Sequence, residues 1–169
     1  MADMISAETV TRIWQQMAQI PAHQAPQLVD HMRTEQPVIL VYLLALDDFP
    51  FDQYEREIIF YMGLVVWQMM KQSKKRLRKV THKKLRQVQD ANDEFLSFLA
   101  SDTEADFVSA TRTMLENYRE PEVLGYIIET LMEEEEFDPD NPPIRDEYRG
   151  LAFIHLKTVL DAFIASLAP

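Results

Sequence analysis

Apolar side chains dominate one stretch near the middle of the chain. From Ile58 to Met70, Gln68 is the only plainly polar residue. A helix that is apolar on every side must be enclosed by other elements. The run is shorter than the roughly 20 residues that a bilayer-spanning helix needs, and charged residues flank it on both sides. We therefore predict that residues 51–70 form a central core helix, with its charged start at residues 55–57 in solvent.

Amphipathic patterns predict further helices before this core helix. Ser6 is a suitable N-cap for a helix that ends before Pro21, and Trp14 is expected to anchor its buried face. Pro26 and Pro37 suit the first turns of two more helices. The second of these, with the sequence PVILVYLLAL, is nearly all apolar and is expected to be buried.

The pattern after the core helix predicts longer helices. Over residues 74–99 the apolar positions stay on one face at about 100° per residue, which indicates one long amphipathic helix. Capping signals and apolar stripes then predict three more helices, over about residues 104–119, 121–136 and 146–167.

The fold class follows from these helical periods and from the scarcity of turn residues. The chain has only three glycines, and no run alternates apolar and polar residues between turn signals as β-strands do. We predict an all-α fold, a single compact helical domain over residues 1–169 with about seven helices. Gly63 falls inside the core helix, where glycine costs about 1 kcal/mol relative to alanine. We expect another helix to cross closely there.

The two halves of the sequence show a weak internal similarity. Placing Pro37 on Pro121 matches PVILVYLLA with PEVLGYIIE, and in both halves an aromatic and acidic loop precedes a strongly apolar helix. We predict two copies of a three-helix unit, residues 26–72 and 104–167, related by a pseudo-two-fold axis and joined by the long helix over residues 74–99. The alternative is that any two apolar helices that start with proline look alike.

No residue pattern in the chain indicates a catalytic, cofactor or metal site. There is no cysteine, the three glycines form no phosphate-binding loop, and the four histidines lack the spacing of paired metal ligands. We expect no cofactor and no metal, and we do not favour an enzyme. The lack of cysteine and of a secretory signal predicts a cytoplasmic location.

The distribution of charge along the chain says more about a binding partner than the net charge of −11 does. Residues 71–86, which we call the basic segment, contain nine of the 17 basic residues and none of the 28 acidic ones. Its cations are Lys71, Lys74, Lys75, Arg76, Arg78, Lys79, Lys83, Lys84 and Arg86. Cations at a helix start and the acidic run at residues 133–140 at a helix end are both unfavourably placed relative to the helix dipole. We predict that the two runs lie side by side.

Three functions from different classes are compatible with this pattern. The first, which we favour, is a non-catalytic helical interaction or scaffold protein that presents a charged groove to a protein partner. The second is a binder of nucleic acid or of an anionic surface through the basic segment, although no aromatic residues alternate with its cations. The third is a small-molecule-binding protein or enzyme with an apolar pocket between the halves, lined by Tyr42, Trp67 and Tyr126.

Overall fold

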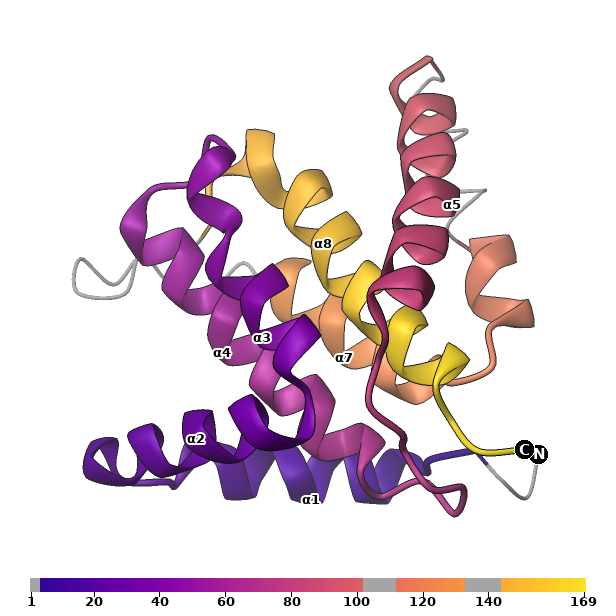
Figure 1. Ribbon diagram of the computed structural model, residues 1–169. Coiled ribbons are helices and arrows are strands. Elements are labelled where there is room, and N and C mark those ends of the chain that lie inside the picture. The colour runs from indigo at the N-terminus through magenta and orange to yellow at the C-terminus, as the bar shows by residue number, and fades with distance from the viewer. Residues whose placement is uncertain (1–3, 102–111, 133–143) are drawn as a thin grey trace.

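The computed structural model of the chain describes residues 4–101, 112–132 and 144–169 (Figure 1). Its named helices are α1 (Ala7–Ala18), α2 (Ala25–Glu35), α3 (Pro37–Leu44), α4 (Gln53–Met70), α5 (His82–Ser101), α7 (Pro121–Met132) and α8 (Asp146–Ala165). Two short 3-10 turns, Ala22–Gln24 and Leu46–Asp48, connect them, and residues 112–117 are also helical. The prediction of a single compact all-α domain is confirmed. Within the described ranges, every helix is too short or too polar to cross a membrane.

Helix α4 lies at the centre of the domain and contacts α1, α3, α7 and α8 (Figure 1). A capping box fixes its start: the Asp52 carboxylate accepts a hydrogen bond from the Glu55 N–H at 2.8 Å, and Glu55 Oε1 accepts from the Asp52 N–H at 2.9 Å. From Met62 to Met70 its residues are buried except for Gln68, which is half-buried. The predicted central core helix is confirmed.

Glu55 is buried, although its position at the helix start predicts a solvated side chain. It pairs with Arg145, which precedes α8: Arg145 Nη2 lies 2.6 Å from Glu55 Oε1, and the Arg145 N–H donates to Oε2 at 2.9 Å. Burial acts to raise the pKa of Glu55, but the hydrogen bonds from Arg145 and from the Asp52 backbone outweigh it and lower the pKa overall. These bonds join the starts of α4 and α8.

At Gly63, helix α4 packs closely against Leu43 of α3. A Cβ at this position would lie 2.7 Å from Cδ1 and 3.0 Å from Cδ2 of Leu43. The prediction that another helix crosses closely at Gly63 is confirmed.

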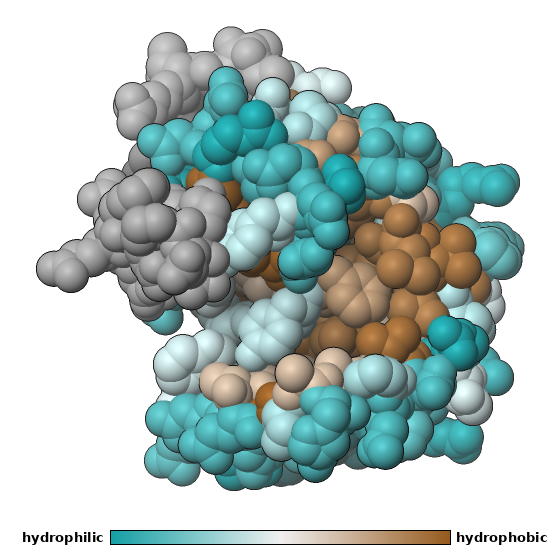
Figure 2. Space-filling model, turned by 90° about the vertical axis from the view of Figure 1, so that its left-hand side faces the viewer, coloured by the Kyte–Doolittle hydropathy of each residue, from teal (hydrophilic) through white to brown (hydrophobic). Residues whose placement is uncertain are grey.

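Helix α3 is buried on one face only, so the expectation that it is fully enclosed is wrong. Ile39, Leu40 and Leu43 face the core, whereas Val41 and Leu44 are 63% and 61% exposed. The face of the molecule on the left of Figure 1 shows a corresponding apolar area in Figure 2. Residues of α3 therefore contribute apolar surface as well as core.

Helix α1 begins as predicted but turns its tryptophan outward. The Ser6 hydroxyl caps it by accepting a hydrogen bond from the Thr9 N–H at 3.1 Å. Its buried stripe consists of Val10, Ile13 and Met17, and Trp14 is 44% exposed. Trp14 lies at the edge of this stripe, where α1 faces α7, so its role as the anchor of α1 is not borne out.

The prediction of one long helix over residues 74–99 is wrong for residues 74–81. Helix α5 begins at His82, and the chain between α4 and α5 forms turns and extended structure. Thr81 is the N-cap of α5, since its hydroxyl accepts a hydrogen bond from the Lys84 N–H at 3.1 Å. A helix through the preceding cations would place like charges four residues apart, as at Lys71, Lys75 and Lys79, which is unfavourable.

A partly buried polar cluster fixes α5 to α8. Lys157 Nζ donates to Asn92 Oδ1 at 2.8 Å and to Asp161 Oδ2 at 2.7 Å, and Asn92 Nδ2 donates to Thr158 Oγ1 at 3.1 Å. The Tyr118 hydroxyl donates to Asp161 Oδ1, and burial together with the charge of Asp161 raises the pKa of Tyr118. Each member of the cluster has a partner, which is typical of a structural network.

The internal repeat stays a prediction. Helix α3 packs against α4 and α7 packs against α8, which is the arrangement that two copies of one unit would have. Residues 102–111 and 133–143 lie outside the described residues. The expected contact of residues 133–140 with the basic segment therefore also falls outside the residues that the structure describes.

Candidate functional site

The basic segment forms turns after α4, is extended over about residues 76–81 and ends in the first turns of α5, and the C-terminus holds one side of its extended part. The Arg78 N–H donates to the Ser166 carbonyl at 3.0 Å, and the Ala168 N–H donates to the Arg76 carbonyl at 2.8 Å. These two bonds form an isolated antiparallel bridge. The backbone of the segment is therefore paired like an edge strand although the fold is helical.

Gln36 holds the other side of the segment. Its Nε2 donates to the Arg78 carbonyl at 2.9 Å, and its Oε1 accepts from the Val80 N–H at 2.9 Å. Gln36 is 1% exposed and has φ −141° and ψ 61°, outside the helical region, because proline disfavours helix at the residue before it. A single side chain at the break between α2 and α3 thus holds the basic segment on the side opposite the C-terminus.

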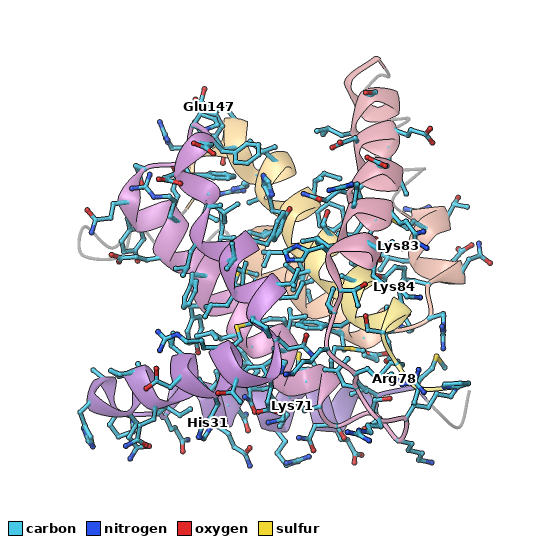
Figure 3. All side chains as sticks on the ribbon, in the orientation of Figure 1. His31, Lys71, Arg78, Lys83, Lys84 and Glu147 are labelled. Carbon is cyan, nitrogen blue, oxygen red and sulfur yellow. The ribbon has the colours of Figure 1, made fainter. Side chains whose placement is uncertain are left out.

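The segment turns its apolar residues inward and its cations outward. Val80 and Leu85 are buried, whereas eight of the nine cations are exposed and Lys75 is half-buried. Figure 3 shows Lys71 and Arg78 below the base of α5, and Lys83 and Lys84 at its first turn. In the part of the chain that the structure describes, one ion pair involves these cations, between Lys71 Nζ and Glu35 Oε2 at 3.4 Å.

Six of the cations line a groove of about 630 Å³, which we call the basic groove. Its lining consists of Glu35, Gln36, Trp67, Lys71 and residues 73–79. Trp67 is 0% exposed, and Lys71 Nζ lies 4.8 Å from the centre of its ring. Lys71 is thus held by an ion pair and a cation–π contact, whereas the cations at residues 74–79 have no ion-pair partner among the described residues.

The structure separates the predicted cations into two groups. Lys71, Lys74, Lys75, Arg76, Arg78 and Lys79 line the basic groove. The other three, Lys83, Lys84 and Arg86, lie in the first turns of α5 and do not line the basic groove. Charge alone could not reveal Gln36 as the residue that organises the groove, although its place before Pro37 signals a break in the helix.

The three residues of the predicted apolar pocket have different surroundings. The Tyr42 hydroxyl lies 2.7 Å from His155 Nδ1, Trp67 belongs to the basic groove, and Tyr126 lines a separate groove between α1 and α7. Tyr42, Trp67 and Tyr126 therefore do not line a common pocket among those formed by the described residues.

His155 is a buried, neutral residue of an aromatic cluster. It is 5% exposed, and the ring centres of Phe49 and Phe51 lie 4.3 and 5.9 Å from its own. Burial lowers the pKa of His155 to about 4, so the ring is uncharged at neutral pH. Within the described ranges, no group of three or more His, Asp or Glu side chains is placed to hold a metal ion.

Comparisons with known proteins do not assign a function to the basic groove. No protein-family model, no curated protein and no solved structure matches the chain. The basic groove is therefore interpreted from its own residues.

Proposed function

We propose that this chain is a non-catalytic interaction protein that binds an acidic segment of a partner protein in the basic groove. The observation that supports this most strongly is the combination of exposed cations with a fixed backbone, since Gln36 and the C-terminal residues hold the segment from both sides. A binding surface that is already ordered loses little conformational freedom when the ligand arrives. Carboxylates of an acidic peptide would supply the counter-charges that the described residues lack. A cytoplasmic location remains part of this proposal.

Two features of the groove favour an acidic peptide over nucleic acid. Trp67 is fully buried, so it offers no face on which a base could stack. The net charge of −11 also opposes the approach of a long polyanion. A short peptide responds mainly to the cations within a Debye length, about 8 Å at physiological ionic strength.

Two triple variants with the same change in net charge test the proposal. The groove variant carries Lys74→Glu, Arg76→Glu and Lys79→Glu, and the control carries Lys83→Glu, Lys84→Glu and Arg86→Glu. Affinity for a short fluorescent Glu-rich peptide is measured by anisotropy. Each exposed ion pair contributes up to about 1 kcal/mol, so we expect the groove variant to bind at least about tenfold more weakly and the control less than about threefold.

Three results would contradict the proposal. Equal weakening by both variants would mean that the peptide responds to total charge and not to the groove. Tighter and groove-dependent binding of an oligonucleotide of equal charge would favour the nucleic-acid hypothesis. If replacement of Glu133, Glu134, Glu135 and Glu136 by glutamine strengthens peptide binding, the acidic run of the same chain competes for the groove and the natural occupant is internal.

A further inference from the structure

The extended part of the basic segment pairs with the C-terminus at Leu77, which forms an isolated antiparallel bridge with Leu167. The two hydrogen bonds of this bridge use the residues on either side of Leu77, because the Arg76 carbonyl and the Arg78 N–H bond to the C-terminal residues. In an antiparallel pair of this kind, the N–H and C=O of the central residue point away from the partner chain. The backbone groups of Leu77 are therefore directed to the edge that the C-terminus leaves open.

This open edge at Leu77 is unpaired in the part of the chain that the structure describes. Neither the Leu77 N–H nor the Leu77 carbonyl forms a hydrogen bond with another described residue, whereas Gln36 bonds to the Arg78 carbonyl and the Val80 N–H. The unpaired backbone of an ordered extended segment is a template for pairing with another chain. Leu77 also lines the basic groove, so a peptide in the groove can reach this edge.

The side chains beside the open edge predict which sequence pairs with it. Successive side chains of an extended chain point to opposite faces, and the burial follows this alternation. Arg76 and Arg78 are exposed, whereas Leu77 between them is half-buried against the core. Residues that pair across two strands lie on the same face. A residue paired with Leu77 therefore lies on the half-buried face, and its two neighbours lie on the face of the arginines.

We propose that the acidic partner binds the basic groove as an added antiparallel β-strand, with an apolar residue opposite Leu77 and an acidic residue on either side of it. The apolar residue donates its N–H to the Leu77 carbonyl and accepts from the Leu77 N–H. The two carboxylates pair with Arg76 and Arg78, which have no ion-pair partner among the described residues. This inference rests on the proposed function and adds the conformation and the sequence pattern of the ligand, since main-chain bonds supply affinity and alternate side chains supply specificity in such complexes.

Three fluorescent peptides of equal charge test the added strand. The parent peptide is Glu-Glu-Val-Glu-Glu, and the other two carry one N-methyl group, either on the valine or on the glutamate that follows it. The valine N–H faces Leu77 in the proposed pairing, whereas the N–H of the next residue points away. We expect N-methylation of the valine to weaken binding at least about tenfold, because the methyl group removes a donor and separates the two strands, and N-methylation of the glutamate to weaken it less than about twofold.

Hydrogen exchange of the Leu77 amide, measured by nuclear magnetic resonance, tests the same pairing from the side of the protein. In the free protein this amide should exchange faster than that of Val80, which Gln36 holds. Saturation with the parent peptide should slow its exchange at least about tenfold, because the amide gains an acceptor. The Lys83 N–H is the control, since it lies outside the groove and has no hydrogen-bond partner among the described residues. Its exchange should stay the same.

Failure of this inference can be distinguished from failure of the proposed function. If the parent peptide does not bind, or binds the groove variant equally well, the proposed function fails and the added strand with it. If it binds in a groove-dependent manner but the two N-methylated peptides have equal affinities, the proposed function stands and the added strand is wrong. Unchanged exchange of the Leu77 amide in that complex would also overturn the added strand. Weakening by N-methylation of the glutamate alone would indicate a parallel strand and contradict the proposed pairing.

Discussion

Replacement of Gln36 by alanine should release the basic segment from the core. The side chain makes two hydrogen bonds of 2.9 Å, one to the Arg78 carbonyl and one from the Val80 N–H. Alanine makes neither bond, and the shorter side chain leaves both backbone groups without their partner.

The expected cost follows from the burial of these groups. A buried polar group that loses its partner costs about 1 to 3 kcal/mol, so two groups set an upper limit of about 6 kcal/mol. The bond from the Val80 N–H is buried, whereas the bond to the Arg78 carbonyl is only partly buried. We therefore expect the free energy of unfolding to fall by about 2 to 3 kcal/mol.

Urea denaturation measures this change, and amide hydrogen exchange locates it. The Val80 N–H should exchange much faster in Gln36→Ala than in the unchanged protein. Gln15→Ala is the matched control, because Gln15 is exposed on α1 and its loss should change stability by less than about 0.5 kcal/mol. If Gln36→Ala matches this control and Val80 keeps its protection, Gln36 does not hold the basic segment.

Three further predictions concern the packing and the pH response of the core. Gly63→Ala should be less stable than Gly125→Ala in urea denaturation. A methyl group at position 63 overpacks against Leu43, which costs about 1 to 3 kcal/mol, whereas a methyl group at position 125 meets no neighbouring atom. Equal stabilities of the two variants would contradict the close approach of α3 and α4. Asp161→Asn should lower the free energy of unfolding by about 2 kcal/mol, because Lys157 loses a charged acceptor, and an unchanged Tm would mean that the polar cluster contributes little. Stability should fall by up to about 3 kcal/mol as the pH drops from 6.5 to about 4, because the unfolded chain takes up a proton that buried His155 does not. His155→Gln should remove this part of the pH profile, and an unchanged profile would show that His155 does not cause it.

Apolar periodicity and capping residues predict most of the fold. The start of α1 follows from Ser6, the enclosure of α4 from its apolar run, and the helix crossing from Gly63. These features depend on residues that are close together in the sequence or on the simple need to bury apolar surface. The start of α5 is also local, since Thr81 is its cap, but the apolar stripe over residues 74–99 hides this signal.

The candidate site and the junction between α4 and α8 depend on contacts that the sequence does not reveal. Gln36 reaches Arg78 across 42 positions, and Arg145 reaches Glu55 across 90. Each pair consists of polar residues that, taken alone, suggest exposed surface. The charge pattern predicts the cations of the basic groove but neither the extended backbone that carries them nor the side chain that holds it.

Nuclear magnetic resonance titration of the ¹⁵N-labelled protein with the Glu-rich peptide tests the basic groove most directly. Gln36 and residues 74–79 line the groove, so the signals of the Gln36 side-chain amide and of the backbone amides of residues 74–79 should shift in a saturable manner. Signals of α7 near Gly125, which lies outside the basic groove, should stay in place. Shifts that do not saturate, or that spread over all exposed cations including Lys83 and Lys84, would contradict the assignment of the basic groove as a binding site for an acidic partner.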